Sequence, residues 1–263
     1  MNDTVKPVTI LELGQKKGRG EKIAMVTAYD YPAGLLADEA GIDVVLVGDS
    51  LGREVLGYDN ELSVTVEDML HHTRAVRRGV RRALILVDMP FLSYQVNEDE
   101  AVRNAGRILQ AGGNAVKIEG GIAIAPTVRR LVNAGIPVMG HIGFQPQSVN
   151  VTGIRRQGTD EESAQRVLDD ALAVQEAGAF AVLMELVPAN LAHRVTQALE
   201  VPTIGIGAGP GCDGQVLVFG DVLGLRRDRP VFKHAKRYAN LGDDILAALT
   251  NYAEDVRSGR FPA

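Results

Sequence analysis

Residues 44–49 read VVLVGD, and three further apolar runs also end in an acidic residue. These runs are LILVD at 84–88, AVKIE at 115–119 and AVLME at 181–185. Most of their positions are apolar in succession rather than in alternation, which is typical of parallel strands covered on both faces. Parallel strands are usually joined by helical crossovers, so these runs predict an α/β fold.

The same rhythm of strand and helix extends along almost the whole chain. The predicted strands cover 23–27, 44–48, 84–88, 115–118, 137–140, 181–185, 203–206 and 215–219. Stretches of helical periodicity cover 32–40, 66–79, 98–110, 123–133, 161–177 and 189–199. Eight strands in this order favour a (β/α)₈ TIM barrel over an open doubly wound sheet, which usually has fewer strands or an appended domain.

Both ends of the chain carry additional helical patterns. Residues 8–18 predict a short N-terminal helix that closes the bottom of the barrel. Residues 243–257 predict a C-terminal helical extension beyond the eighth strand. Because no linker marks a second domain, we expect residues 1–263 to form a single barrel domain.

Composition disfavours several classes of protein. Lys and Arg number 28 against 33 Asp and Glu, a net charge of −5, which gives no support to nucleic-acid binding. The densest basic group, Arg74 to Arg82, has the spacing of a helix end, where cations complement the dipole. Cys212 is the single cysteine, so we expect a cytoplasmic protein. No run approaches the roughly 18 apolar residues that would predict a membrane span.

The four acids that end apolar runs are the most informative feature. Asp49, Asp88, Glu119 and Glu185 should meet at one face, because the carboxyl ends of parallel strands in a barrel all lie there. Any one of them alone could be a helix N-cap. Four together would repel each other unless a cation or a shared proton offsets their charge. Oxygen ligands indicate Mg²⁺, whereas Zn²⁺ would require a Cys and His spacing that is absent from the sequence.

Two basic side chains are expected at the same face. Lys117 and Glu119 are two residues apart on one strand, so both should point into the barrel mouth. Lys117 could form a structural ion pair, hold a substrate carboxylate or act as a Schiff base, and the sequence leaves these possibilities open. His141 ends the fifth run and is a candidate accessory residue.

A glycine-rich stretch at 205–211, GIGAGPG, follows the seventh predicted strand. A dinucleotide-binding loop must open a helix, but here a strand-like run follows. We therefore predict a loop that permits close approach of the backbone rather than a nucleotide site.

Several sequence blocks resemble one known family. They are TAYDYP at 27–32, VGDSLG at 47–52, VDMPF at 87–91, VKIEGG at 116–121, PQSVN at 146–150, MELVP at 184–188 and PTIGIGAGP at 202–210. They occur in order, cover most of the chain and are similar to the ketopantoate hydroxymethyltransferase family, whose members are 3-methyl-2-oxobutanoate hydroxymethyltransferases.

The resemblance implies a TIM barrel that binds Mg²⁺, a 2-oxo acid and 5,10-methylenetetrahydrofolate. The product would be 2-dehydropantoate, on the route to pantothenate and coenzyme A, and the assembly would be a homo-oligomer, commonly a decamer. Asp49, Asp88 and Glu119 resemble the metal ligands, and Asp49, Ser50, Asp88 and Lys117 resemble the groups that hold the oxo acid. Glu185 resembles the proton acceptor.

That chemistry needs these residue types. Loss of the proton at C3 of the oxo acid places negative charge on the carbonyl oxygen, and Mg²⁺ would stabilise the resulting enolate. Lys117 would neutralise the substrate carboxylate, and Glu185 would accept the proton. The enolate would then attack the methylene carbon of the folate.

The sequence departs from the family pattern in three places. Phe144-Gln145 replaces a usually smaller pair, VTGIRRQG at 151–158 is an unusual form of a glycine-containing loop, and Phe219-Gly220 lacks a polar residue often found there. None of these positions is a predicted metal ligand or base. We expect any effect to concern folate affinity, loop ordering or assembly.

Two other functions fit the same pattern of residues. A Mg²⁺-dependent lyase that splits a 2-oxo or 2-hydroxy acid would use the same site without folate. A non-catalytic barrel that only binds a metabolite would be expected to lose one or more of the four acids, but all four are present.

Overall fold

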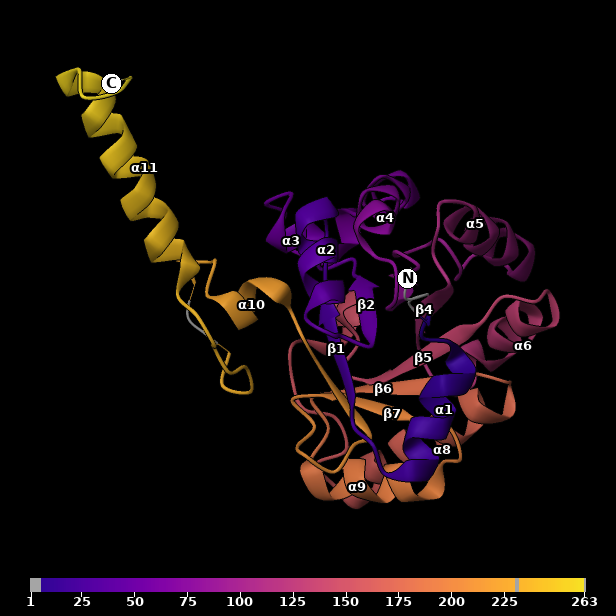
Figure 1. Ribbon diagram of the computed structural model, residues 1–263. Helices are drawn as coiled ribbons and strands as arrows, with labels where there is room; N and C mark the ends of the chain where they lie inside the picture. The colour runs from indigo at the N-terminus through magenta and orange to yellow at the C-terminus, as the bar shows by residue number, and fades with distance from the viewer. Residues whose placement is uncertain (1–5, 230–231, 263) are drawn as a thin grey trace. The chain divides into compact units, whose positions relative to one another are not determined.

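Eight strands close into a barrel in which β1 to β8 follow one another in chain order (Figure 1). The strands are β1 (Ile23–Thr27), β2 (Val44–Val47), β3 (Leu84–Asp88), β4 (Ala115–Glu119), β5 (Val138–Gly143), β6 (Ala181–Glu185), β7 (Thr203–Ile206) and β8 (Gly214–Leu217). From β1 to β8, each strand pairs in parallel with the next. The (β/α)₈ TIM barrel predicted from the sequence is confirmed.

The computed structural model describes residues 6–229 and 232–262. The chain divides into two compact units, Met1–Val216 and Leu217–Ala263. Each is described by itself below, and the expectation of a single domain over 1–263 stays a prediction.

The first unit has one helix before β1 and further helices between the strands, which cover the barrel (Figure 1). They are α1 (Ile10–Arg19), α2 (Tyr31–Glu39), α3 (Leu51–Glu54), α4 (Val66–Gly79), α5 (Glu98–Gln110), α6 (Ala125–Asn133), α7 (Val149–Thr152), α8 (Glu161–Glu176) and α9 (Ala189–Ala198). Short 3₁₀ helices are η1 (Glu61–Ser63), η2 (Ile122–Ile124) and η3 (Pro146–Ser148). Polar side chains begin several of the long helices: Asp30, Thr65, Asn97 and Asp160 each accept a backbone N–H of the first turn.

Two strands end more than one residue away from the sequence prediction. The fifth was predicted at 137–140, but β5 continues to Gly143, because His141, Ile142 and Gly143 pair with successive residues of β6. His141 therefore lies within the strand and not after it. The eighth was predicted at 215–219, but β8 ends at Leu217 and the apolar run continues into a helix that begins at Phe219. Periodicity does not detect that change, because a short apolar run fits either a strand or a helix.

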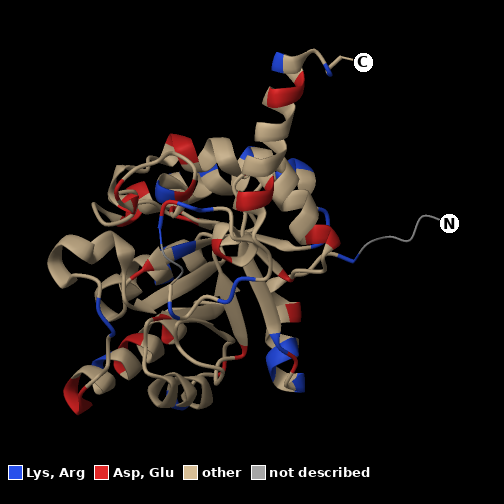
Figure 2. Ribbon diagram, turned by 90° about the vertical axis from the view of Figure 1, so that its left-hand side faces the viewer, with Lys and Arg blue, Asp and Glu red and all other residues tan. Residues whose placement is uncertain are grey.

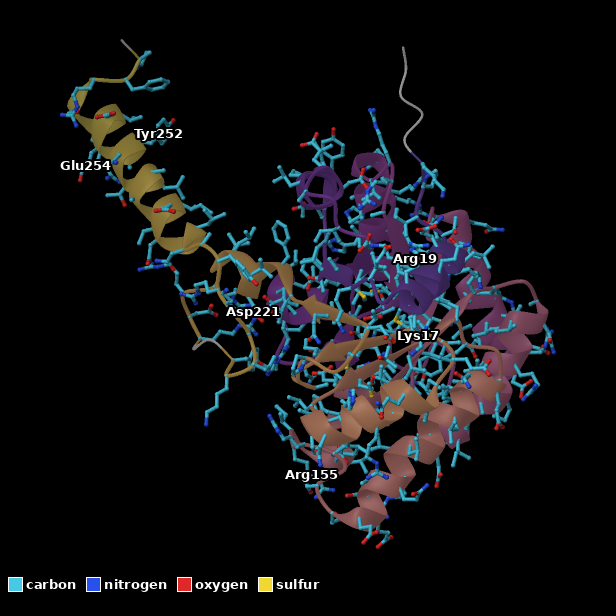
Figure 3. The ribbon with its side chains drawn as sticks, turned by 60° about the horizontal axis from the view of Figure 1, so that its bottom comes forward. Lys17, Arg19, Arg155, Asp221, Tyr252 and Glu254 are labelled. Atoms are coloured by element: carbon cyan, nitrogen blue, oxygen red, sulfur yellow. The ribbon has the colours of Figure 1, made fainter. Side chains whose placement is uncertain are left out.

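The N-terminal helix packs against the inside of the barrel, as predicted. Leu13 on α1 and Val8 before it are buried in one cluster with inward-facing residues of the strands, such as Met25 and Leu46. The Val8 N–H donates to Arg82 O at 2.7 Å. Lys17, near the end of the helix (Figure 3), forms an ion pair with Asp213 at 2.9 Å.

Acidic and basic residues are interspersed along the ribbon (Figure 2). The arginines between 74 and 82 lie at the C-terminal end of α4 and just beyond it, where Arg77 and Arg78 are exposed, as predicted for a helix end. Within 6–229 and 232–262, none of the helices combines the length and the apolar character that a membrane crossing requires.

The second unit contains two helices, α10 (Phe219–Leu223) and α11 (Leu241–Ser258), which confirms the predicted C-terminal helix. Charged pairs join the segment between these helices to both of them. Arg229 Nη2 lies 3.0 Å from Asp221 Oδ1 on α10, and Arg227 Nε lies 2.6 Å from Asp243 Oδ1 on α11. Tyr252 on α11 (Figure 3) is 57% exposed.

Leu13→Ala should lower the free energy of unfolding by about 2–5 kcal/mol, because it removes buried methyl groups and leaves a cavity at the barrel end. Leu11→Ala in the same helix is the matched control, since Leu11 is 73% exposed and Leu13 only 1%. Urea denaturation of both variants measures the difference. Equal effects would show that α1 does not close the barrel in solution.

Candidate active site

Strand register places five ionisable side chains together at the carboxyl ends of the strands. Asp88 on β3 is paired with Lys117 on β4, and Glu119 on β4 is paired with His141 on β5. Asp49 follows β2 by two residues. All five are buried, and each is 5% exposed or less.

Lys117 lies between an acid and a histidine. Its Nζ is 3.0 Å from Asp88 Oδ1 and 3.1 Å from His141 Nδ1. Burial alone would lower the pKa of Lys117, but Asp88, Glu119 and Asp49 together raise it above its ordinary value. Lys117 is therefore charged, and in this structure it has the ion-pair role that the sequence left open.

Burial and neighbouring acids disfavour the negative charge of Asp49. Its backbone N–H donates to Asp88 Oδ2 at 3.0 Å, and its Oδ2 accepts from Gln147 Nε2 at 2.8 Å. Burial, and then the charges of Asp88 and Glu119, raise the pKa of Asp49 well above its ordinary value, although Lys117 and Gln147 oppose this. The pocket thus holds more negative charge than its single lysine neutralises.

Glu185, at the end of β6, contacts the cluster through His141. Its Oε2 lies 3.4 Å from His141 Nε2, and Glu119 Oε1 lies 3.5 Å from His141 Nδ1, both long for hydrogen bonds. Burial and Lys117 lower the pKa of His141, but Glu119 and Glu185 outweigh them and raise it. The Glu185 side chain is 19% exposed, against 4% for Asp88 and 3% for Glu119.

Unusual backbone fixes the position of Glu185. Its carbonyl accepts from Phe144 N–H at 2.8 Å, directly after Gly143, whose φ is +87°. A Cβ at Gly143 would lie 2.4 Å from Glu185 O. Leu186 has φ +50°, a left-handed conformation that is rare outside glycine and concentrates at functional sites.

Comparison with known proteins identifies the family. The sequence profile described as ketopantoate hydroxymethyltransferase matches residues 7–263. The chain belongs to the ketopantoate hydroxymethyltransferase family. The 3-methyl-2-oxobutanoate hydroxymethyltransferase of Chloroflexus aurantiacus is 59% identical over 97% of this chain and 90% of its own length. The enzyme of that name from Moorella thermoacetica is 57% identical over 97% of this chain and 95% of its own length.

Two solved structures of similar fold are more distant in sequence than these ketopantoate hydroxymethyltransferase relatives. A phosphonopyruvate hydrolase solved with oxalate and Mg²⁺ has a TM-score of 0.64 and 14% identity, over 95% of this chain and 87% of that one. A 2,3-dimethylmalate lyase has a TM-score of 0.61 and 18% identity, over 95% and 88%. At these identities the likeness shows the shared barrel fold alone.

The charged residues that the structure brings together in this member of the ketopantoate hydroxymethyltransferase family were predicted from the sequence. Three neutral residues of the site were not: Tyr29, Tyr94 and Gln147. The Tyr29 hydroxyl lies 2.8 Å from Oγ of Ser50, which was predicted. Gln147 contacts Asp49, and the Tyr94 hydroxyl lies 3.1 Å from Gln147 Oε1. Tyr29 and Gln147 stand inside blocks quoted for the family resemblance, which was the available signal, whereas nothing in the sequence pointed to Tyr94.

The glycine-rich loop at 205–211 has the predicted character. It leads from β7 into β8 and not into a helix. The prediction that a strand follows this loop is therefore confirmed for this ketopantoate hydroxymethyltransferase family member, and the absence of a nucleotide site stays a prediction.

The donor set fits a hard divalent cation. No three Asp, Glu, His or Cys side chains among residues 6–229 and 232–262 are arranged so that they could hold a metal ion as they stand. Mg²⁺, however, needs only one or two carboxylates, with water and substrate completing its shell. Glu119 Oε1 is buried without a hydrogen-bond partner among the described residues, and Asp49 carries unbalanced charge. Both observations match a site for a cation.

Gly143→Ala should destabilise the fold by roughly 1–3 kcal/mol more than Gly135→Ala, because the new Cβ would overlap Glu185 O. Both glycines have positive φ, +87° and +81°, but nothing lies within 4 Å of a Cβ at Gly135. The difference between the two variants therefore measures the effect of the close contact, because both share the cost of placing alanine at positive φ. Chemical denaturation measures both, and equal losses would contradict the expected overlap.

The metal-free protein, held in EDTA, should become less stable as pH rises from about 4 toward the raised pKa of Asp49. Over that range the unfolded chain releases the Asp49 proton while the folded chain keeps it, so folding opposes deprotonation. Asp49→Asn should flatten this dependence and be more stable than the unsubstituted chain at neutral pH. Urea titrations across pH test it, with the exposed Glu39→Gln as control. An unchanged slope in Asp49→Asn would contradict the assignment.

Proposed function

We propose that this chain transfers a hydroxymethyl group from 5,10-methylenetetrahydrofolate to 3-methyl-2-oxobutanoate, giving 2-dehydropantoate for pantothenate and coenzyme A synthesis. The observation that carries the proposal is the more exposed Glu185 carboxylate beside a buried cluster of acids and Lys117. The names of the relatives support the same transfer.

Lys117 and the acids of β2, β3 and β4 bind the reactants in this proposal. Asp49, Asp88 and Glu119 would hold Mg²⁺, which supplies Lewis-acid stabilisation of negative charge on a carbonyl oxygen. Lys117 binds the substrate carboxylate, since its raised pKa keeps it charged. Asp49, Ser50 and Asp88 complete the site for the oxo acid.

Glu185 acts as the base. Its side chain is more exposed than those of Asp88 and Glu119, the other two acids that contact Lys117 or His141. The C3 proton of the substrate can therefore reach Glu185. His141, 3.4 Å away, stabilises the Glu185 carboxylate before the proton moves. One water molecule supplies the hydroxyl oxygen: it cleaves the C–N bonds of the methylene bridge, which frees tetrahydrofolate and leaves the one-carbon unit at the oxidation level of formaldehyde. The carbon deprotonated at C3 then bonds to that one-carbon unit, and the new alkoxide takes up a proton to become the hydroxymethyl group.

We also propose that the chain assembles as a homo-oligomer, with a decamer as the specific expectation. The apolar residues along α11 support assembly, because Leu249 and Tyr252 are 60% and 57% exposed. Burial of such a face against a second copy removes apolar surface from water. The cytoplasmic location stays a prediction.

Proton exchange tests the chemistry directly. Loss of the C3 proton signal of 3-methyl-2-oxobutanoate in D₂O, followed by NMR, should require both Mg²⁺ and Glu185. Glu185→Gln should slow exchange by about 10²–10⁴-fold, as expected for removal of a general base. The exposed Glu200→Gln is the control and should exchange normally.

Addition of 5,10-methylenetetrahydrofolate should then yield 2-dehydropantoate. No exchange under any condition, even with tetrahydrofolate present, would overturn the mechanism. Full exchange in Glu185→Gln would assign the base elsewhere. Cleavage of an oxo acid or hydroxy acid without the folate donor would instead favour the lyase.

A further inference from the structure

We propose that Gln147 is a positioning residue that orients Asp49 and Glu119 for a divalent cation; the inference rests on the metal role proposed above. Gln147 lies on η3 in the loop after β5 and is 6% exposed. Its side-chain Nε2 donates to Asp49 Oδ2 at 2.8 Å, and its backbone N–H donates to Glu119 Oε2 at 3.0 Å. One residue thus holds carboxylates at the ends of β2 and β4, two strands that do not pair with each other.

Every polar atom of the Gln147 side chain is engaged. The second Nε2 hydrogen is donated to Met89 O at 2.9 Å. Oε1 lies 3.1 Å from the Tyr94 hydroxyl and accepts from Gln95 Nε2 at 3.0 Å. These partners fix the orientation of the amide, because a flipped group would place its oxygen against the Asp49 carboxylate and the Met89 carbonyl.

Gln147 contacts one carboxylate oxygen of each acid and leaves the other oxygen unused. Gln147 uses Oε2 of Glu119, whereas Oε1 is buried and has no hydrogen-bond partner among the described residues. At Asp49 it uses Oδ2. A carboxylate held through one oxygen keeps its other oxygen for a ligand, and its rotation is restricted.

The chemistry of an amide suits this position. A second lysine here would neutralise the acids and compete with a cation for them. A neutral donor orients Asp49 without adding a positive charge that would compete with a cation. Groups that orient metal ligands in this way typically contribute 10–100-fold to metal affinity.

Gln147→Met tests the inference, because the methionine side chain has similar length but cannot make the hydrogen bonds of the amide, whereas the backbone N–H that donates to Glu119 is kept. Titration of the protein with Mn²⁺ alone, followed by electron paramagnetic resonance of the free ion, should show about 10–100-fold weaker binding. Gln145→Met is the matched control, since the Gln145 side chain makes no hydrogen bond within the described residues, and its affinity should be unchanged. Gln147→Asn keeps the amide but shortens the reach, and should weaken binding if Gln147→Met does not fold.

A second readout separates positioning from a general loss of structure. In the exchange assay, Gln147→Met should raise the Mg²⁺ concentration for half-maximal rate by the same 10–100-fold. The rate at saturating Mg²⁺ should stay within a few-fold. Equal Mn²⁺ affinity in Gln147→Met and the unsubstituted protein overturns the inference alone. Failure of the unsubstituted protein to bind Mn²⁺ or Mg²⁺ overturns the proposed metal role itself.

Discussion

Three carboxylates buried around a single lysine are the constraint on which the rest of the site depends. Asp49, Asp88 and Glu119 are removed from water at the barrel mouth, and Lys117 is the one ammonium that contacts them in the described structure. Such a group of like charges is costly unless something offsets it. Burial and the charges of Asp88 and Glu119 raise the pKa of Asp49, which favours its protonated form in the metal-free protein, and a bound cation would displace that proton. The same repulsion that destabilises the empty pocket therefore favours a divalent ligand.

Around this charge the protein places neutral hydrogen-bonding groups rather than further ions. The Tyr94 hydroxyl accepts from the backbone N–H of Glu119 at 3.0 Å, and Tyr29 pairs with Ser50 beside Asp49. These bonds fix the geometry of the acids without cancelling their charge. Such a rigid site requires supporting residues whose own polar atoms are all hydrogen-bonded, as those of the Gln147 side chain are.

The sequence was sufficient for the barrel and for the charged part of the site, because acids at the ends of parallel strands must converge. It could not give strand register, which decides that Lys117 neighbours Asp88 and that Gly143 neighbours Glu185. Nor could it show that β5 continues through His141, since a strand end depends on pairing with β6 and not on local pattern. Gln147 carries no charge and stands in a short 3₁₀ turn, so neither periodicity nor electrostatic reasoning singles it out.

The packing of α1 against the inner face of the barrel has a consequence for the order of events. Val8 and Leu13 fill one end of the barrel interior. In the proposed reaction, the oxo acid and the folate donor would then share the open end. An oxo acid held by the buried Lys117 would bind before the donor. The product formed from it would leave last, which would make the architecture of the barrel a determinant of kinetic order.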